Sequence, residues 1–214
     1  TCFGDIGRNG KAGFEALKRA GLRGVLYQET EFSPDDRTAA DDFTKLREKY
    51  LALRETATDL VEVGLSPHSP YTVSPKLFSL ITELALEHDV KVSIHAAESE
   101  DEDELVINGS GFFTEVYAKF GVEWKSPGCS TIEYLKSTGI LDTRPLLAHC
   151  VTVTDADIGM IAATGSKVAH CPKSNAKFGH GYAPLERFLD VGITVGLGSD
   201  SVASNNLCDM IEEA

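Results

Sequence analysis

Short apolar segments alternate with amphipathic segments along the whole chain. The apolar segments are too short for helices and are rich in Val, Ile, Leu and Gly. Their apolarity is continuous rather than alternating, which is typical of strands buried on both faces of a parallel sheet. We predict strands at Cys2–Ile6, Gly24–Tyr27, Val61–Leu65, Val90–His95, Pro145–Cys150, Lys167–Cys171 and Thr194–Leu197.

The segments between these strands carry apolar residues at helical spacing. We predict helices at Gly13–Ala20, Thr38–Leu60, Pro75–His88, Asp155–Ala163 and Pro184–Leu189. Ser74 is expected to cap the third of these helices, with Pro75 in its first position, and Thr154 is expected to cap the fourth.

This alternation of strands and helices predicts an α/β fold in one domain, residues 1–214. The seven predicted strands are one fewer than a TIM-type (β/α)8 barrel contains, and such barrels usually have about 250 residues. We therefore predict an incomplete barrel. The alternative is an open, doubly wound sheet, but no Gly-x-Gly-x-x-Gly follows the first strand.

Polar side chains stand where five of the predicted strands end. They are His68, His95, His149, His170 and Asp200. The carboxyl ends of parallel barrel strands meet at one mouth, so these side chains should converge there. Imidazole nitrogens and a carboxylate suit Zn²⁺ or Fe²⁺.

His95 and Glu98 form the most coherent pair. A lone histidine in an apolar strand is usually a hydrogen-bonded core residue. Residues three apart on a strand point to opposite faces, so both side chains reach the mouth only if the strand ends near Ala97 and the chain turns. With that turn, His95 would bind the metal and Glu98 would carry protons.

The other histidines and Asp200 leave more alternatives open. His149 and His170 are each either a ligand, an acid/base or a structural residue. Asp200 is costly to bury without a cation or hydrogen-bond donors, and Ser204 is one residue that could donate to it. His68 would contact substrate or cap its loop. His88 and His180 are interpreted as solvent-facing or loop residues without a role.

An acidic segment, Glu98–Glu104, follows the fourth strand. It opens a long excursion that extends to about Gly128. We interpret most of its carboxylates as a solvated loop. Because loops at this end of a barrel build active sites, the excursion could also act as a lid.

Composition narrows the classes of partner. The chain has 33 acidic and 20 basic residues, a formal charge of −13, which disfavours nucleic acid and anionic membranes as partners. No apolar stretch reaches the roughly 18 residues that a membrane span needs. The five cysteines are widely spaced and no signal sequence opens the chain, so we expect a cytoplasmic protein that acts on a small-molecule substrate.

Five motifs resemble those of the amidohydrolase superfamily, and they occur in that family's order. They are Ser66-Pro67-His68-Ser69-Pro70-Tyr71, Ile94-His95-Ala96-Ala97-Glu98, Ala148-His149-Cys150, His170-Cys171-Pro172-Lys173-Ser174-Asn175, and Gly198-Ser199-Asp200 with Ala203-Ser204-Asn205-Asn206. The resembled branch contains methylthioadenosine/S-adenosylhomocysteine deaminases, aminodeoxyfutalosine deaminases and triazine hydrolases.

The resemblance implies a (β/α)8 barrel with one divalent metal, zinc or alternatively iron. His95 and Asp200 would be metal ligands, and Asp200 would also help to deprotonate the attacking water. Glu98 would be the acid/base and would contact the substrate, as would His149, which polarises the reacting centre. His68 would contact a nucleoside-like substrate. His170 and Ser204 would lie behind the ligands or touch the substrate, and members of this branch often self-associate.

Two features depart from the family pattern. The family's first strand ends in a His-x-His pair of metal ligands, and this chain contains no such pair. We therefore expect the first strand and the flanking β domain to be missing here. The deaminases usually carry an Arg after the third strand, and Leu26-Tyr27-Gln28-Glu29-Thr30 contains none.

The leading hypothesis is a hydrolytic deaminase of an adenine-type nucleoside. The substrate would resemble aminodeoxyfutalosine or methylthioadenosine/S-adenosylhomocysteine. One alternative is a triazine or chlorohydrolase-type enzyme, which would use the same activation of water. The other alternative is a non-catalytic barrel that lacks the metal.

Overall fold

The computed structural model describes residues 2–214 and contains seven parallel strands. Every predicted strand is present, with ends shifted by a few residues. The strands are β1 (Cys2–Gly7), β2 (Arg23–Glu29), β3 (Val61–Ser66), β4 (Ser93–Ala96), β5 (Leu146–His149), β6 (Lys167–His170) and β7 (Val195–Leu197).

The strands form two sheets in chain order, β1-β2-β3 and β4-β5-β6-β7. A parallel bridge between Leu65 and Val92 joins them, and His95 donates its backbone N–H to the carbonyl oxygen of His68 at 2.8 Å. Neighbouring strands are therefore consecutive in the sequence throughout, as in a barrel wall. All seven carboxyl ends lie on the same side, which places the predicted site residues along one rim.

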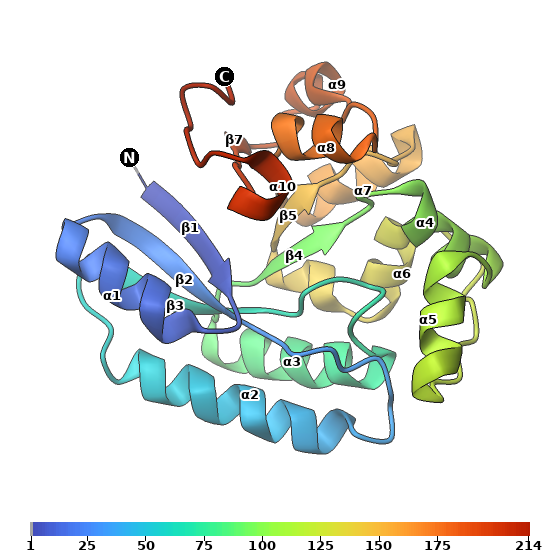
Figure 1. The fold of residues 1–214 in the computed structure, drawn as a ribbon, viewed down its shortest axis with the longest axis horizontal. Coiled ribbons are helices and arrows are strands. Elements are labelled where there is room, and N and C mark those ends of the chain that lie inside the picture. Colours follow the sequence, from blue (N-terminus) through green and yellow to red (C-terminus); the bar gives the residue numbers. More distant parts are fainter. Residues whose placement is uncertain (1) are drawn as a thin grey trace.

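Helices follow the strands and cover the outside of this wall (Figure 1). The longer ones are α1 (Gly10–Ala20), α2 (Ala39–Arg54), α3 (Pro75–His88), α5 (Phe112–Phe120), α6 (Thr131–Ser137) and α7 (Asp155–Thr164). Short helical segments are α4 (Glu100–Asp103), η1 (Glu104–Asn108), η2 (Ile140–Thr143), α8 (Pro172–Phe178), α9 (Leu185–Asp190) and α10 (Val202–Asn205).

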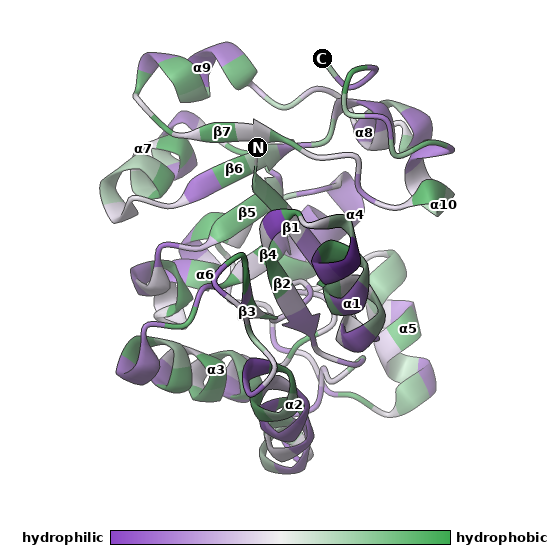
Figure 2. Ribbon diagram, turned by 90° about the vertical axis from the view of Figure 1, so that its left-hand side faces the viewer, coloured by the Kyte–Doolittle hydropathy of each residue, from purple (hydrophilic) through white to green (hydrophobic). Residues whose placement is uncertain are grey.

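The predicted caps are confirmed. Ser74 Oγ accepts the backbone N–H of Leu77, and Thr154 forms a reciprocal capping box with Asp157. The second predicted helix was too long, because α2 ends at Arg54 and residues 55–60 form the connection to β3. Helix α3 carries alternating green and purple bands in Figure 2, as expected for a helix with one buried face.

The main core lies between the strands and helices α2, α3, α6 and α7. Leu65, Ile94, Leu147 and Val168 come from successive strands and are fully buried in it. Because the strands are covered by helices outside and face one another inside, their continuous apolarity matches their environment. A smaller cluster around Phe14 and Leu26 packs α1 on β2.

Most carboxylates of the acidic segment reach solvent, as predicted, but the segment is helical and one carboxylate is buried. The segment forms α4 and η1, and Glu102 is fully buried. Ser99 caps α4, which turns the Glu102 carboxylate back towards the end of β4. Among the described residues, no helix combines the length and the apolarity that crossing a membrane would require.

Candidate active site and metal centre

Four of the predicted site residues converge at the rim formed by the strand ends. The ring centroids of His68 and His95 lie 4.7 Å apart, and those of His95 and His149 lie 5.5 Å apart. One ligand atom each from His95, His149 and Asp200 lies within 4.8 Å of the other two. This donor group comes from β4, β5 and the loop after β7, which only the parallel wall brings together.

His95 is held as a metal ligand would be. Its Nδ1 lies 3.0 Å from the carbonyl oxygen of His68, so Nδ1 carries the proton and donates it. Nε2 of His95 is then unprotonated and can face a cation. A histidine ligand usually has its second nitrogen fixed in this way.

Asp200 completes this group from the loop after β7, where its φ of +54° turns the chain sharply. Ser174 and Ser204 each donate a hydroxyl hydrogen bond to Oδ2 of Asp200 at 2.7 Å. Burial opposes ionisation of Asp200, but these two hydrogen bonds and the nearby histidines outweigh it and lower the pKa of the carboxyl. Asp200 is therefore an anion at neutral pH, and Ser204 lies behind it as a donor.

His149 ends β5 with a φ of +72° and is 1% exposed. Its Nδ1 lies 2.9 Å from Oδ1 of Asn175 in α8, so Nδ1 donates and Nε2 faces the mouth. Asn175 is the last residue of the His170–Asn175 motif, and the sequence alone predicts no role for it. The motif was the signal that could have identified it.

Glu98 reaches the mouth because the chain turns where the sequence required a turn. Strand β4 ends at Ala96, and Ala97 has a φ of +51°. The buried Glu102 carboxylate accepts the backbone N–H groups of Ala97 at 2.9 Å and Glu98 at 3.0 Å. Glu102 thus holds the turn, which non-glycine residues adopt only with support from their surroundings.

Burial of Glu102 should make the stability of the protein depend on pH. Desolvation raises the pKa of Glu102 from 4.5 to about 8, although the two backbone donors oppose this. A raised carboxyl pKa gives stability that is complete below pH 4.5 and is lost as the pH rises towards 8, at about 1.4 kcal/mol per pH unit for one group at most. Glu102→Gln removes this titration.

Thermal unfolding of the full-length protein and of Glu102→Gln between pH 5 and pH 8 measures the effect. We expect the wild type to lose stability with rising pH relative to the variant, although the variant is less stable at pH 5 because it lacks one backbone acceptor. Glu100→Gln, an exposed position in the same helix, is the control. Parallel pH curves for all three proteins would contradict the prediction.

The Glu98 carboxylate faces three side chains. Its Oε1 lies 3.7 Å from Nε2 of His149 and 3.6 Å from Nε2 of His180, and Tyr71 donates its hydroxyl to Oε2 at 3.2 Å. Burial and the nearby Glu98 carboxylate raise the pKa of Tyr71, so Tyr71 keeps its proton and stays a donor. The ring of Phe113 in α5 stacks on Tyr71 with centroids 4.2 Å apart.

His180 lies in the loop after α8, as expected, but its side chain is only 23% exposed and faces Glu98. It lies between Gly179 and Gly181, and its Nε2 lies 3.6 Å from Oε1 of Glu98. A histidine flanked by two glycines just after the His170–Asn175 motif was the available signal. By contrast, His170 lies outside both donor groups found in residues 2–214, and its buried Nδ1 has no partner among them.

His68 lies on the other side of His95. Its Nδ1 contacts the hydroxyls of Ser69 and Thr72, each at 2.9 Å, and Nε2 lies 4.0 Å from Oε1 of Glu29. Burial, together with His95, lowers the pKa of His68 to about 3, so His68 is neutral at physiological pH.

Glu29, at the end of β2, forms a second donor group with His68 and His95. Burial raises the pKa of Glu29. Its Oε2 lies 3.4 Å from Nε of Arg8, which follows β1. The guanidinium of Arg8 therefore reaches this side of the mouth. The related deaminases usually carry an Arg after their third strand, which corresponds to β2 here, and this chain has no Arg at that position. The sequence interpretation assigned roles to neither Glu29 nor Arg8.

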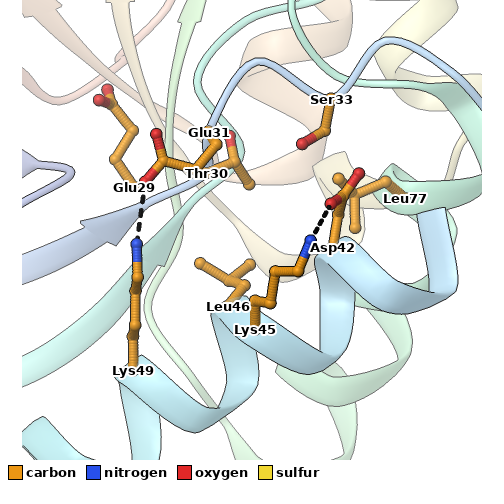
Figure 3. A pocket seen from close by; sticks show the side chains of 9 residues that line it. All are labelled: Glu29, Thr30, Glu31, Ser33, Asp42, Lys45, Leu46, Lys49 and Leu77. Atoms are coloured by element: carbon orange, nitrogen blue, oxygen red, sulfur yellow. Dashed lines mark hydrogen bonds and ion pairs between the residues drawn. The ribbon is translucent and has the colours of Figure 1, made fainter. Parts of the chain in front are cut away.

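A small hollow of about 20 Å³ lies beside this region, between the end of β2 and helix α2 (Figure 3). The ion pair Lys49–Glu31 joins α2 to the segment after β2 at this hollow, the ion pair Lys45–Asp42 runs along α2, and the Glu29 side chain points away from both lysines (Figure 3). None of the converging histidines lines this hollow. It is therefore separate from the mouth where the donor atoms meet.

Known proteins with similar sequences include two kinds of deaminase. Over 200 residues the chain is 33% identical to the 5-methylthioadenosine/S-adenosylhomocysteine deaminase of Halothermothrix orenii, covering 94% of this chain and 42% of the relative. It is 35% identical over 202 residues to the 5'-deoxyadenosine deaminase of Methanothermobacter thermautotrophicus, covering 92% and 42%. The chain thus spans less than half the length of these relatives.

Solved structures with the same fold are more distant in sequence. Aminofutalosine deaminase of Helicobacter pylori has a TM-score of 0.83 and 21% identity, covering 97% of this chain and 50% of its own. A zinc-bound adenosine deaminase from Xanthomonas campestris has a TM-score of 0.79 and 24% identity, covering 100% and 45%. A triazine hydrolase from Arthrobacter aurescens has a TM-score of 0.77 and 21% identity, covering 99% and 47%.

The family model described as "Amidohydrolase family" matches residues 1–214. These neighbours share the parallel α/β architecture, and the chain is a partial domain of it. His68, His95, His149, Glu98 and Asp200 lie at one mouth of this architecture, and the chain belongs to the amidohydrolase family.

Proposed function

We propose that the full-length protein carrying this chain is a metal-dependent hydrolase of C–N bonds, and specifically a hydrolytic deaminase of an adenine-type nucleoside. One observation carries the proposal. Donor atoms of His95, His149 and Asp200 lie within 4.8 Å of one another, and the Glu98 carboxylate lies 3.7 Å from His149. The two deaminase relatives support the substrate class.

The donor set fits a divalent metal, for which we propose zinc. His95 offers an unprotonated Nε2, and Asp200 offers an anionic carboxylate braced by two serines. Zinc sites of hydrolases use such nitrogen and oxygen ligands, and a bound zinc would lower the pKa of a water to about 7. We propose that residues outside the described chain supply the remaining ligands.

In this proposal, three residues of the chain have separate roles in the deamination. Glu98 accepts a proton from the attacking water and returns it to the departing ammonia, which a positioned carboxylate can do. Asp200 also accepts a hydrogen bond from that water. His149, whose Nδ1–H is held by Asn175, would stabilise the negative charge that develops at the attacked centre when its Nε2 also carries a proton.

Substrate binding falls to the sides of the mouth. Neutral His68 contacts the nucleoside through Nε2, the nitrogen that Ser69 and Thr72 leave free. Glu98 and His149 touch the reacting ring, and Ser204 acts through Asp200 or at the edge of the site.

All five cysteines are free thiols, which supports a reducing, cytoplasmic location.

A triazine hydrolase is the second candidate, because a solved structure of that activity shares the fold with a TM-score of 0.77. Both reactions displace a group from an electron-poor heterocycle with water. The difference lies in the ring and in the leaving group, which is ammonia in one case and chloride or an amine in the other.

Substrate screening of the zinc-loaded full-length protein tests the proposal. We expect release of ammonia from methylthioadenosine, S-adenosylhomocysteine, 5'-deoxyadenosine or aminodeoxyfutalosine, with the inosine-type product seen by absorbance. Turnover of chloro- or alkylaminotriazines without ammonia release from adenosines would favour the second candidate. If the full-length protein binds no metal and turns over none of these substrates, the alternative of a non-catalytic barrel would be favoured.

A further inference from the structure

His180 faces the same carboxylate oxygen that faces His149. Nε2 of His180 lies 3.6 Å from Oε1 of Glu98, and Nε2 of His149 lies 3.7 Å from it. The side chains of Glu98 and His180 are 15% and 23% exposed, so the contact is mostly shielded from water. Contacts of this length in a site without substrate often shorten when substrate binds.

The two imidazoles cannot play the same part. Nδ1 of His149 donates to Oδ1 of Asn175, so Nε2 of a neutral His149 carries a lone pair. A lone pair repels the carboxylate and cannot donate to it. A neutral His149 can therefore accept a hydrogen bond from water through Nε2, but it does not hold Glu98.

His180 has no such restriction. Its ring lies against Phe178, with centroids 5.5 Å apart, and its Nε2 faces Glu98. Nδ1 of His180 has no hydrogen-bond partner within residues 2–214, so the proton can stand on Nε2, which faces Glu98. Tyr71 already donates to the other oxygen, Oε2. His180 is the donor that Oε1 otherwise lacks.

The backbone aims His180 at this oxygen. Its N–H donates to the carbonyl oxygen of Asn175 at 2.9 Å, so one residue anchors both imidazoles. Gly179 and Gly181 on either side have φ values of +73° and +105°. Those conformations favour glycine and allow the chain to reverse over the mouth.

We propose that His180 is a positioning residue that donates from Nε2 to Oε1 of Glu98 and holds the carboxylate in its reactive orientation. With Tyr71 donating to Oε2 and His180 donating to Oε1, a lone pair of Oε1 is left on the His149 side to take the proton of the attacking water. This inference rests on the proposed function, because it assigns to His180 the positioning of Glu98, the proposed acid/base of the deamination. His180 acts through Glu98 and need not touch the substrate.

Kinetics of the zinc-loaded full-length protein test this role. Hydrogen bonds to charged groups have net values that correspond to about 10- to 100-fold in rate. We expect His180→Leu to lower kcat by about that factor, with KM changed less than about threefold and zinc content unchanged. His180→Gln, which keeps an N–H donor, should recover most of kcat. His88→Leu, an exposed histidine on α3, is the control and should behave as wild type.

A double variant separates positioning from a general structural effect. If His180 acts through Glu98, adding His180→Leu to Glu98→Gln should not lower the residual rate further. An equal loss in both backgrounds would overturn the proposal. So would a wild-type kcat in His180→Leu, an equal loss in His180→Gln, or a rise in KM alone.

A second readout does not depend on turnover. In nuclear magnetic resonance spectra of the zinc-loaded protein, the Nε2–H proton of His180, identified by its loss in His180→Leu, should exchange slowly with water. In Glu98→Ala it should exchange at least tenfold faster. Equal exchange in both proteins would overturn the inference. If no adenosine is deaminated but this difference is found, the proposed function fails while the role of His180 stands.

Discussion

Glu98→Gln should lower kcat of the full-length protein by about 10²- to 10⁴-fold while zinc stays bound. The amide matches the carboxylate in shape and can still accept the Tyr71 hydroxyl, but it cannot take up the proton of the attacking water. Glu98 does not belong to the donor group of His95, His149 and Asp200, so the substitution leaves the proposed metal ligands in place. Metal analysis and steady-state kinetics with the best substrate measure both quantities.

The control for this change is Glu100→Gln, which makes the same substitution at an exposed position two residues further along. It should keep wild-type kcat and KM. A Glu98→Gln protein that retains more than about a tenth of wild-type kcat would contradict the role of Glu98 as proton carrier. Loss of zinc together with activity would instead place Glu98 among the ligands.

Asp200→Ala should abolish measurable turnover and reduce zinc affinity by well over 100-fold. Loss of a residue behind a ligand costs about 10- to 100-fold in metal affinity, and loss of a ligand costs more. The variant also leaves the hydroxyls of Ser174 and Ser204 without their common acceptor. Competition with a chelator of known affinity gives the zinc dissociation constant.

Ser174→Ala provides a graded comparison, because it removes one donor from Asp200 and keeps the carboxylate. Its zinc affinity should lie between those of wild type and Asp200→Ala. Asp142→Asn is the matched control, since Asp142 is exposed and precedes β5 at the opposite end of the strands. Stoichiometric, tight zinc in Asp200→Ala would show that Asp200 is not a ligand.

The predictable part of the fold came from local patterns. Continuous apolar segments identified all seven strands, because strands covered on both sides have no polar face. Ser74 and Thr154 identified two helix starts, because their hydroxyls satisfy free backbone N–H groups at those positions. The end of α2 was missed because its charged residues continue the helical pattern beyond Arg54.

The acidic segment shows where local patterns mislead. Six carboxylates within seven residues are typical of a solvated loop, and most of them are solvent-accessible. Glu102 is buried because it accepts the N–H groups of the turn at Ala97 and Glu98. Nothing within the segment itself distinguishes Glu102 from its neighbours, since the distinction depends on where α4 packs.

The sequence by itself determined the order of strands and helices, and it determined which of its residues stand at strand ends. His95, Glu98, His149 and Asp200 could be found there because parallel strands place all their carboxyl ends on one side. The tertiary structure alone decided the partners of these residues. Asn175 behind His149, Glu102 behind Glu98, Arg8 beside Glu29 and His180 over Glu98 are contacts between separate segments. Such contacts depend on the curvature of the wall and on left-handed turns after the strands, and neither is encoded in the residues that meet.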